Sequence, residues 1–199
     1  MIARLPTDAP RKPRTRRVRG EEDAVGQTAR VGIGFDVHRL VRGRPLYLGG
    51  LEIESPLGLE GHSDGDVVLH CVTDALLGAC GESDIGDFFP ADDPQWKGAS
   101  SDTFLAKAMA KVGKAGLALA NVDTVIIAER PHLGAWKEGI RSSLAGLLGL
   151  PIDRVCVKAK TNEGLGPVGK GEAIEAHAVV LLEPAKKAKS AKKKSAKRK

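Results

Sequence analysis

Apolar and polar residues alternate with two different periods along the chain, and these periods predict an order of strands and helices. Val31, Ile33, Phe35 and Val37 alternate with small or polar residues, which is the pattern of a half-buried strand. Strands are also predicted at 46–53, 122–128, 155–160 and 174–182, and helices at 66–80, 101–113 and 136–148. We expect an α/β (α+β) domain with a roughly four-stranded mixed sheet and three helices packed on one face.

The formal net charge of +6 hides an acidic centre between two basic ends. Residues 1–30 carry eight Arg/Lys and four Asp/Glu, and residues 184–199 carry nine Arg/Lys and no acid. Residues 31–183 therefore hold 14 basic and 21 acidic side chains. We expect a disordered basic extension over 1–30, one domain over 31–183 and a disordered Lys/Ala-rich tail over 184–199. The tails favour weak contacts with anionic polymers, but the acidic centre argues against a nucleic-acid-binding domain.

Composition excludes several classes of protein. No apolar run approaches the ~20 residues of a membrane span, and no signal peptide is visible at the N-terminus. The three cysteines, Cys71, Cys80 and Cys156, are too few and too widely spaced for a disulfide framework or a cysteine metal site. We expect a cytoplasmic protein with reduced, mostly buried thiols.

The first candidate for chemistry is a set of two histidines and one aspartate. Asp36 and His38 lie two apart on a predicted strand, so their side chains leave the same face. His70 lies on the predicted helix 66–80, where Asp66 or Asp74 could orient its ring. Two histidines and a carboxylate match a catalytic zinc that keeps a position open. The alternative is a buried structural His70 hydrogen-bonded to Asp66 or Asp74.

The turn before the predicted helix 66–80 is a candidate phosphate site. Ser63 or Asp64 is expected to cap the helix, and the unpaired N–H groups of a helix N-terminus attract phosphate. The acidic, turn-rich segment 84–93 is either a solvated connection or, as its length suggests, a mobile loop over a site.

A glycine-rich segment near the C-terminus offers a second candidate. Residues 164–169 match G-x-G-x-x-G, but they precede a predicted strand instead of opening a helix, which excludes a dinucleotide site. Glu163 beside Thr161 could hold a hydrated divalent cation on phosphates, or could be an ordinary exposed acid. On the following strand, His177 is expected to be packed or paired, for example with Glu175.

In combination these motifs resemble the 2-C-methyl-D-erythritol 2,4-cyclodiphosphate synthase family over residues 31–183. The resemblance lies in 35–38 (FDVH), 62–66 (HSDGD), 73–78 (TDALLG), 84–86 (DIG) and parts of 157–172, with His70, Phe89, Pro90 and Asp93. It implies a phosphorus–oxygen lyase of non-mevalonate isoprenoid biosynthesis. The substrate would be 4-diphosphocytidyl-2-C-methyl-D-erythritol 2-phosphate, whose 2-phosphate attacks its own β-phosphate and releases CMP. The family also implies a homotrimer with sites at subunit interfaces.

The resemblance implies a role for each matching residue. The ligands of one Zn²⁺ per subunit would be Asp36, His38 and His70, and Glu163 would bind a second cation, Mg²⁺ or Mn²⁺, that bridges the diphosphate. His62 and Thr161 would stabilise the transition state. The implied substrate contacts are Asp36, Val37, His38, His62, Ser63, Asp84, Ile85, Gly86, Phe89, Pro90, Ala91, Asp92, Asp93, Ala128, Glu129, Arg130, Pro131, His132, Leu133, Gly134, Lys160, Thr161, Asn162, Glu163, Pro167 and Lys170. The chain departs from the family pattern at His132, Lys160, Asn162, Pro167 and Lys170.

Two other functions stay open from the residues alone. A zinc-dependent phosphohydrolase, which uses water as nucleophile, would explain the two histidines and the aspartate but not the segments 128–134 and 160–163. A nucleic-acid-associated protein would act through the basic tails without catalysis.

Overall fold

A computed structural model describes residues 28–90, 92–96 and 98–186 of the chain. Its strands and helices, including two short 3-10 helices η1 and η2, follow this order: β1 Arg30–Val41, β2 Leu46–Leu48, β3 Leu51–Ile53, β4 Gly58–Leu59, α1 Val67–Ala79, α2 Ile85–Phe88, η1 Pro94–Trp96, α3 Ser101–Lys114, β5 Leu117–Ile127, α4 Lys137–Leu148, η2 Ile152–Arg154, β6 Val155–Lys160, α5 Gly166–Gly169 and β7 Ala173–Pro184.

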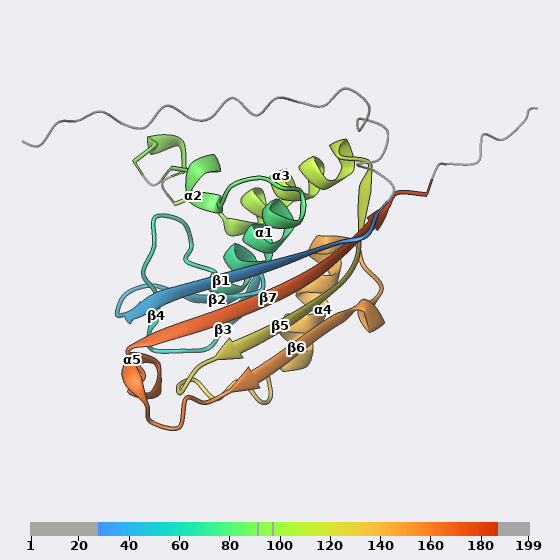
Figure 1. Cartoon of the computed structure of the whole chain (residues 1–199). Coiled ribbons are helices and arrows are strands. Elements are labelled where there is room, and N and C mark those ends of the chain that lie inside the picture. The colour runs from blue at the N-terminus through green and yellow to red at the C-terminus, as the bar shows by residue number, and fades with distance from the viewer. Residues whose placement is uncertain (1–27, 91, 97, 187–199) are drawn as a thin grey trace, which may run out of the picture.

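The central sheet has five strands in the order β4-β1-β7-β5-β6 (Figure 1). β7 pairs antiparallel with both β1 and β5, while β5 and β6 are parallel. The predicted mixed sheet is thus confirmed, with the two-residue β4 as an additional edge strand. The predicted strand 46–53 is instead a separate hairpin, β2 and β3, because Gly49 and Gly50 between them take positive φ angles.

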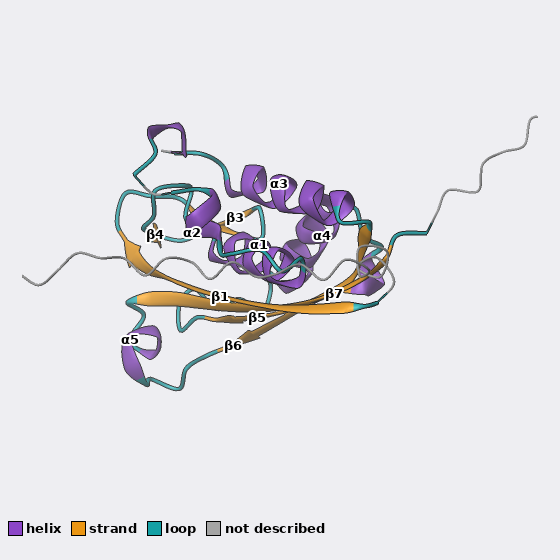
Figure 2. Ribbon diagram, turned by 45° about the horizontal axis from the view of Figure 1, so that its top comes forward, coloured by secondary structure: helices purple, strands orange, loops and turns teal. Residues whose placement is uncertain are grey.

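Helices α1, α3 and α4 cover one face of the sheet, as expected (Figure 2). α1 is the central element, and nearly all of its side chains are buried, including those of Leu69, Val72 and Leu76. A helix that is apolar on most sides needs partners on most sides, and α1 contacts β1, β7 and α3.

Two glycines of β1 bring this helix unusually close to the sheet. A Cβ atom on Gly32 would lie 1.8 Å from the carbonyl oxygen of Ala75, and one on Gly34 would lie 1.8 Å from that of Cys71. The α1 backbone therefore rests directly on the β1 backbone. This close approach brings residues of β1 and of the first turn of α1 together.

The apolar face of β1 is the exposed one, which corrects the sequence-based expectation of a strand that buries its apolar side. Val31 and Ile33 are 67% and 72% exposed, and Phe35, Val37 and Val179 of β7 are also exposed. The buried positions of β1 are Gly32 and Gly34 because α1 packs on that side. One face of the sheet is therefore apolar and uncovered in the single chain.

The proposed domain limits fall close to the ends of the sheet. β1 includes Arg30 and β7 includes Pro184, while residues 1–27 and 187–199 of the two predicted extensions lie outside the described residues. Within the described part of the chain, no helix has the length and apolar character needed to cross a bilayer. Cys71 is buried and Cys80 half-buried, but Cys156 is exposed, so the prediction of mostly buried thiols is wrong for Cys156.

The glycine-rich segment 164–169 contains a short helix, which the sequence pattern did not predict. α5 is a single turn that connects β6 to β7. β5 is parallel to β6 and antiparallel to β7, so β6 and β7 run in opposite directions. A dinucleotide fingerprint needs a longer helix leading to a parallel strand, so this topology agrees with the exclusion of such a site.

Candidate metal and active site

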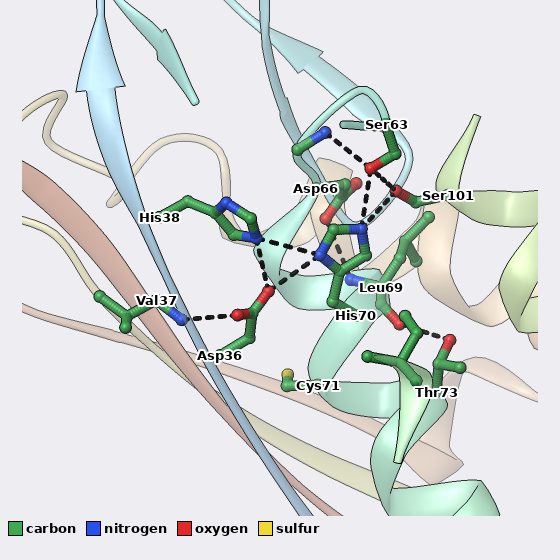
Figure 3. A network of polar contacts seen from close by, with 12 residues as sticks. Asp36, Val37, His38, Ser63, Asp66, Leu69, His70, Cys71, Thr73 and Ser101 are labelled. Carbon is green, nitrogen blue, oxygen red and sulfur yellow. Dashed lines mark hydrogen bonds and ion pairs between the residues drawn. The ribbon is translucent and has the colours of Figure 1, made fainter. Parts of the chain in front are cut away.

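Three potential metal ligands converge where β1 passes the first turn of α1 (Figure 3). Asp36 Oδ2 lies 2.8 Å from His38 Nε2. The same oxygen lies 2.9 Å from His70 Nδ1, and the two histidine nitrogens are 3.2 Å apart. Among the described residues, this is the set of His, Cys, Asp and Glu side chains whose ligand atoms cluster closely enough to hold a metal ion.

The spacing of these atoms fits a small tetrahedral metal ion. Ligand atoms about 2.0–2.1 Å from zinc at tetrahedral angles are about 3.3 Å apart. The three observed separations are slightly shorter than this and nearly equal. The donor set, two imidazole nitrogens and one carboxylate oxygen, also matches the ligands that zinc prefers when a fourth position stays open.

The charges of this cluster are strongly coupled. Burial raises the pKa of the Asp36 carboxyl, but hydrogen bonds and charges from His38 and His70 outweigh burial and hold that pKa well below its usual range. Burial lowers the pKa of His38, but the Asp36 carboxylate beside the ring raises it above its usual value. Asp36 is therefore ionised at neutral pH, as a metal ligand must be.

Each histidine is also held from its far side. The Nδ1 atom of His38 contacts the carbonyl oxygen of Glu60, which leaves Nε2 to face Asp36. The Nε2 atom of His70 lies 3.0 Å from Ser63 Oγ and 2.9 Å from Ser101 Oγ, which leaves Nδ1 to face Asp36. Second hydrogen bonds of this kind orient the rings of metal-binding histidines.

The expectation that Asp66 or Asp74 orients His70 is wrong. Asp66 is fully buried and caps α1 by accepting hydrogen bonds from the backbone N–H groups of Val68 and Leu69. It also accepts from Gly49 N and Gly50 N. The carboxylate of Asp74 accepts from the N–H of Ile85 at 2.7 Å. Both carboxylates serve the backbone instead of the imidazole.

The capping role of Asp66 corrects the expected N-cap of α1 and bears on the expected phosphate site. Asp66 is the N-cap in place of Ser63 or Asp64. Its side chain accepts hydrogen bonds from the N–H groups of Val68 and Leu69, so these two groups of the first turn are not free to bind a phosphate.

The metal cluster forms one wall of a cavity of about 250 Å³. The lining residues predicted from the sequence are Asp36, His38, His62, Ser63, His70, Ile85, Gly86 and Phe89. The sequence did not single out Trp96 and Phe104, which also line the cavity. Phe104 stacks against Phe89 with ring centroids 4.6 Å apart, and Trp96 meets both rings edge to face. The cavity thus has a charged metal side and an aromatic side.

The segment 84–93 reaches this cavity from α2. Asp84 caps that helix by accepting from the N–H of Asp87 at 3.1 Å, so the start of the predicted mobile loop is a capped helical turn. Pro90, Asp92 and Asp93 follow α2 outside the lining of the cavity, and Ala91 lies outside the described residues.

The predicted substrate contacts of the segments 128–134 and 160–163, which the family resemblance assigns to cytidine recognition, lie elsewhere, around the ends of β5 and β6. The N–H of Ala128 donates to the carbonyl oxygen of Lys160, and the N–H of Asn162 lies 3.3 Å from Glu129 Oε2. Thr161 Oγ1 donates to Glu163 Oε1 at 2.7 Å. None of the residues 128–134 or 160–163 lines the metal cavity of the same chain.

Some of the predicted contacts line a different cavity, of about 450 Å³. Arg130, Pro131, His132 and Lys170 line it, and Pro167 lies on the nearby helix α5. Leu133 is buried in the core, and Gly134 is exposed. One chain therefore holds the predicted site residues in separate groups.

Comparison with known proteins identifies the family. The family model described as the YgbB family matches residues 29–183. The 2-C-methyl-D-erythritol 2,4-cyclodiphosphate synthase of Gloeobacter violaceus is 58% identical over 158 residues, which are 79% of this chain and 97% of the relative.

Solved structures agree with this match. A 2C-methyl-D-erythritol-2,4-cyclodiphosphate synthase in a CDP-bound form is 47% identical, with a TM-score of 0.72 over 77% of this chain and 100% of that one. The bifunctional IspDF from Campylobacter jejuni is 41% identical, with a TM-score of 0.76. The match covers 79% of this chain but 42% of the bifunctional chain, so this chain corresponds to less than half of that protein. From these matches, the chain belongs to the YgbB family, whose 2-C-methyl-D-erythritol 2,4-cyclodiphosphate synthases are lyases of isoprenoid biosynthesis.

Proposed function

We propose that this chain converts 4-diphosphocytidyl-2-C-methyl-D-erythritol 2-phosphate into 2-C-methyl-D-erythritol 2,4-cyclodiphosphate and CMP, in the cytoplasm. The observation that carries the proposal is the convergence of Asp36, His38 and His70 on one wall of a cavity, in a chain of this family. The cavity has the two surfaces that such a substrate needs: a charged side for phosphate and an aromatic side for the methylated carbon chain.

The three converging side chains would hold a zinc ion, and Glu163 would hold a second cation, Mg²⁺ or Mn²⁺, on the diphosphate. Bound cations supply positive charge that stabilises the developing charge on the phosphoryl oxygens and on the leaving CMP. None of the residues that line the cavity is Lys or Arg. This composition suits a site in which metal ions provide the positive charge.

The protein's own task is to position the substrate. The nucleophile is the 2-phosphate of the substrate, and the bond broken joins the β-phosphorus to the CMP oxygen, so no protein nucleophile is needed. Ile85, Gly86 and Phe89 would hold the carbon chain folded, so that the 2-phosphate lies in line with the β-phosphorus. His62 at the cavity wall and Thr161 would donate hydrogen bonds to the transferring phosphoryl group.

We further propose that the chain acts as a homotrimer with its sites at subunit interfaces. Two observations support this. The uncovered apolar face of β1 and β7 would be buried by neighbouring copies. The segments 128–134 and 160–163 do not reach the metal cavity of their own chain, so they would complete the cavity of a neighbour.

Sedimentation equilibrium of the full chain is expected to give three times the 21.0 kDa mass of one chain. The expected cause is burial of the apolar residues Val31, Ile33 and Phe35 between copies. A monomer that retains full activity at the same concentration would contradict both the assembly and the shared site.

The reaction is tested by incubating the full chain with the diphosphocytidyl substrate, Zn²⁺ and Mg²⁺ in ¹⁸O-labelled water. Equal amounts of CMP and unlabelled cyclic diphosphate are expected, because no water enters the bond that forms. A linear product that contains ¹⁸O would instead identify the zinc-dependent phosphohydrolase. Chelation of the divalent cations is expected to stop CMP release, and adding zinc with magnesium is expected to restore it.

The same assay addresses the non-enzymatic alternative. The basic ends that would contact nucleic acid or other anionic polymers are 1–30 and 184–199, of which 1–27 and 187–199 lie outside the described residues. Any such contact is expected to weaken steeply as salt rises and to leave the cyclisation rate unchanged. Absence of any turnover, together with retained polymer binding, would favour the alternative.

A further inference from the structure

A second row of polar side chains lies behind His70, on the side away from Asp36 and His38 (Figure 3). Ser101 is the first residue of α3, and its Oγ atom lies 2.9 Å from His70 Nε2. The same hydroxyl donates to Asp64 Oδ1, and Ser101 N donates to Asp64 Oδ2 at 2.9 Å. Ser101 is fully buried, and His70 is nearly so. A continuous chain of hydrogen bonds thus joins Asp64 to the imidazole.

The direction of each hydrogen bond in this chain follows from the groups involved. An ionised carboxylate only accepts hydrogen bonds, so the Ser101 hydroxyl must give its proton to Asp64. The Ser101 oxygen then presents only lone pairs to His70 Nε2, so this contact is attractive only when Nε2 carries the proton. A neutral imidazole with its proton on Nε2 has a lone pair on Nδ1, which is the atom that faces Asp36 and His38.

We propose that Asp64 and Ser101 are positioning residues that hold His70 in the tautomer and orientation needed for metal binding through Nδ1. This inference rests on the metal-ligand role of His70 in the proposed function. Neither residue lies among the ligand atoms of the metal cluster, so they act only through His70.

Ser63 alone does not perform this task. Its hydroxyl lies 3.0 Å from His70 Nε2, and it accepts a hydrogen bond from Gly65 N at 3.2 Å. No described contact ties the Ser63 proton to a carboxylate, so this hydroxyl is able to donate to Nε2 as well as to accept from it. Ser101 differs from Ser63 because its hydroxyl proton is given to Asp64, so its oxygen can only accept a hydrogen bond from His70 Nε2.

The hydrogen-bond chain Asp64–Ser101–His70, which we term the tether, also joins three parts of the fold that are separate in the sequence. Asp64 belongs to the turn before α1, Ser101 begins α3, and His70 lies in the first turns of α1. The backbone reinforces the link, since Asp64 N donates to the carbonyl oxygen of Ala99 and Gly98 N donates to that of His62. The start of α3 is thereby held against the metal cluster.

The test compares the variants Asp64→Asn and Asp102→Asn. The two carboxylate oxygens of Asp64 accept from Asp66 N, Ser101 N and Ser101 Oγ, but an amide at position 64 offers only one oxygen. Its NH₂ group either faces one of these donors or donates to the Ser101 oxygen, which turns the Ser101 hydroxyl proton toward His70 Nε2. We expect zinc affinity, measured by competition with a chelator, to fall by about 10- to 100-fold. Asp102→Asn makes the same chemical change beside Ser101 on an exposed residue, and it should bind zinc within about twofold of the parent chain.

A spectroscopic readout separates positioning from a general loss of stability. In the zinc-loaded parent chain, the Nε2–H of His70 should give a slowly exchanging proton resonance, because it is buried and hydrogen-bonded to Ser101. That resonance should move and exchange faster in Asp64→Asn and in Ser101→Ala. A variant that is less stable to unfolding but keeps the parent's resonance and zinc affinity would overturn the proposal.

Coupling between the two residues provides the last criterion. Because Asp64 acts through Ser101, the double variant Asp64→Asn/Ser101→Ala should lose no more zinc affinity than Ser101→Ala alone. Losses that add in the double variant would overturn the tether while leaving the ligand assignment intact. A parent chain that binds no zinc would instead overturn the ligand assignment of the proposed function, and the tether with it.

Discussion

Replacing His70 with alanine is expected to remove stoichiometric zinc and to lower the rate of CMP release by about a thousandfold or more. The substitution takes away one of three ligand atoms and leaves the Asp36 carboxylate and His38 to hold the ion alone. A thousandfold lower rate corresponds to about 4 kcal/mol of lost transition-state stabilisation, because each tenfold change in rate equals about 1.4 kcal/mol. Zinc content by elemental analysis and CMP release under saturating substrate are the two measurements.

The isosteric variant Asp36→Asn separates charge from shape at the same cluster. It keeps the volume of the side chain but removes the negative charge that faces both histidines, so zinc affinity should fall here as well. Asp153→Asn is the matched control, since Asp153 is exposed on η2 and does not line the cavity. If His70→Ala folds normally and retains stoichiometric zinc, the ligand assignment is wrong.

Replacing Gly34 with alanine is expected to destabilise the domain severely. The added Cβ would lie 1.8 Å from the carbonyl oxygen of Cys71, and neither atom can move away by rotation of a side chain. α1 would have to shift away from β1, at a cost of about 3 kcal/mol or more. For a domain of this size, such a loss lowers the melting temperature by roughly 6–12 °C. Thermal unfolding followed by circular dichroism measures it.

The same shift should weaken metal binding, because α1 carries His70 and β1 carries Asp36 and His38. Gly113→Ala is the matched control, since Gly113 is an exposed residue of α3 around which an added Cβ meets nothing within 4 Å. That control should stabilise the chain by about 0.5–1 kcal/mol, through better helix propensity. A Gly34→Ala chain with the parent's melting temperature and zinc affinity would show that α1 does not rest on β1 as described.

The pattern of residues predicted most of the regular elements because these depend on local spacing. The helices 66–80, 101–113 and 136–148 appear within a few residues as α1, α3 and α4. The hairpin at 46–53 was missed as a hairpin because each of its strands has only three residues. The capping role of Asp66 was also missed, since Ser63, Asp64 and Asp66 are all good capping residues and the sequence does not distinguish them.

The sequence predicted the three residues of the metal cluster but not the side chains Ser101 and Phe104 that surround it. Asp36 and His38 share a strand face by their spacing, and His70 on the following helix completed a two-histidine, one-carboxylate set independently of any family resemblance. One partner of His70 Nε2, Ser101, lies 31 residues further along the chain, where no local pattern links it to His70. Phe104 had the spacing of an ordinary core residue, so nothing in the sequence indicated that it lines the cavity.

The sequence by itself determined the order of elements, the acidic centre between basic ends, and the residue types able to bind a metal ion. These follow from local periodicity, charge and side-chain chemistry. Only the tertiary structure decided which face of β1 is buried and which nitrogen of each histidine faces Asp36. The first depends on the close approach of α1 to Gly32 and Gly34, and the second on the contacts of His38 with Glu60 and of His70 with Ser63 and Ser101. Except for the Ser63 contact, these join residues far apart in the sequence, which no local pattern encodes.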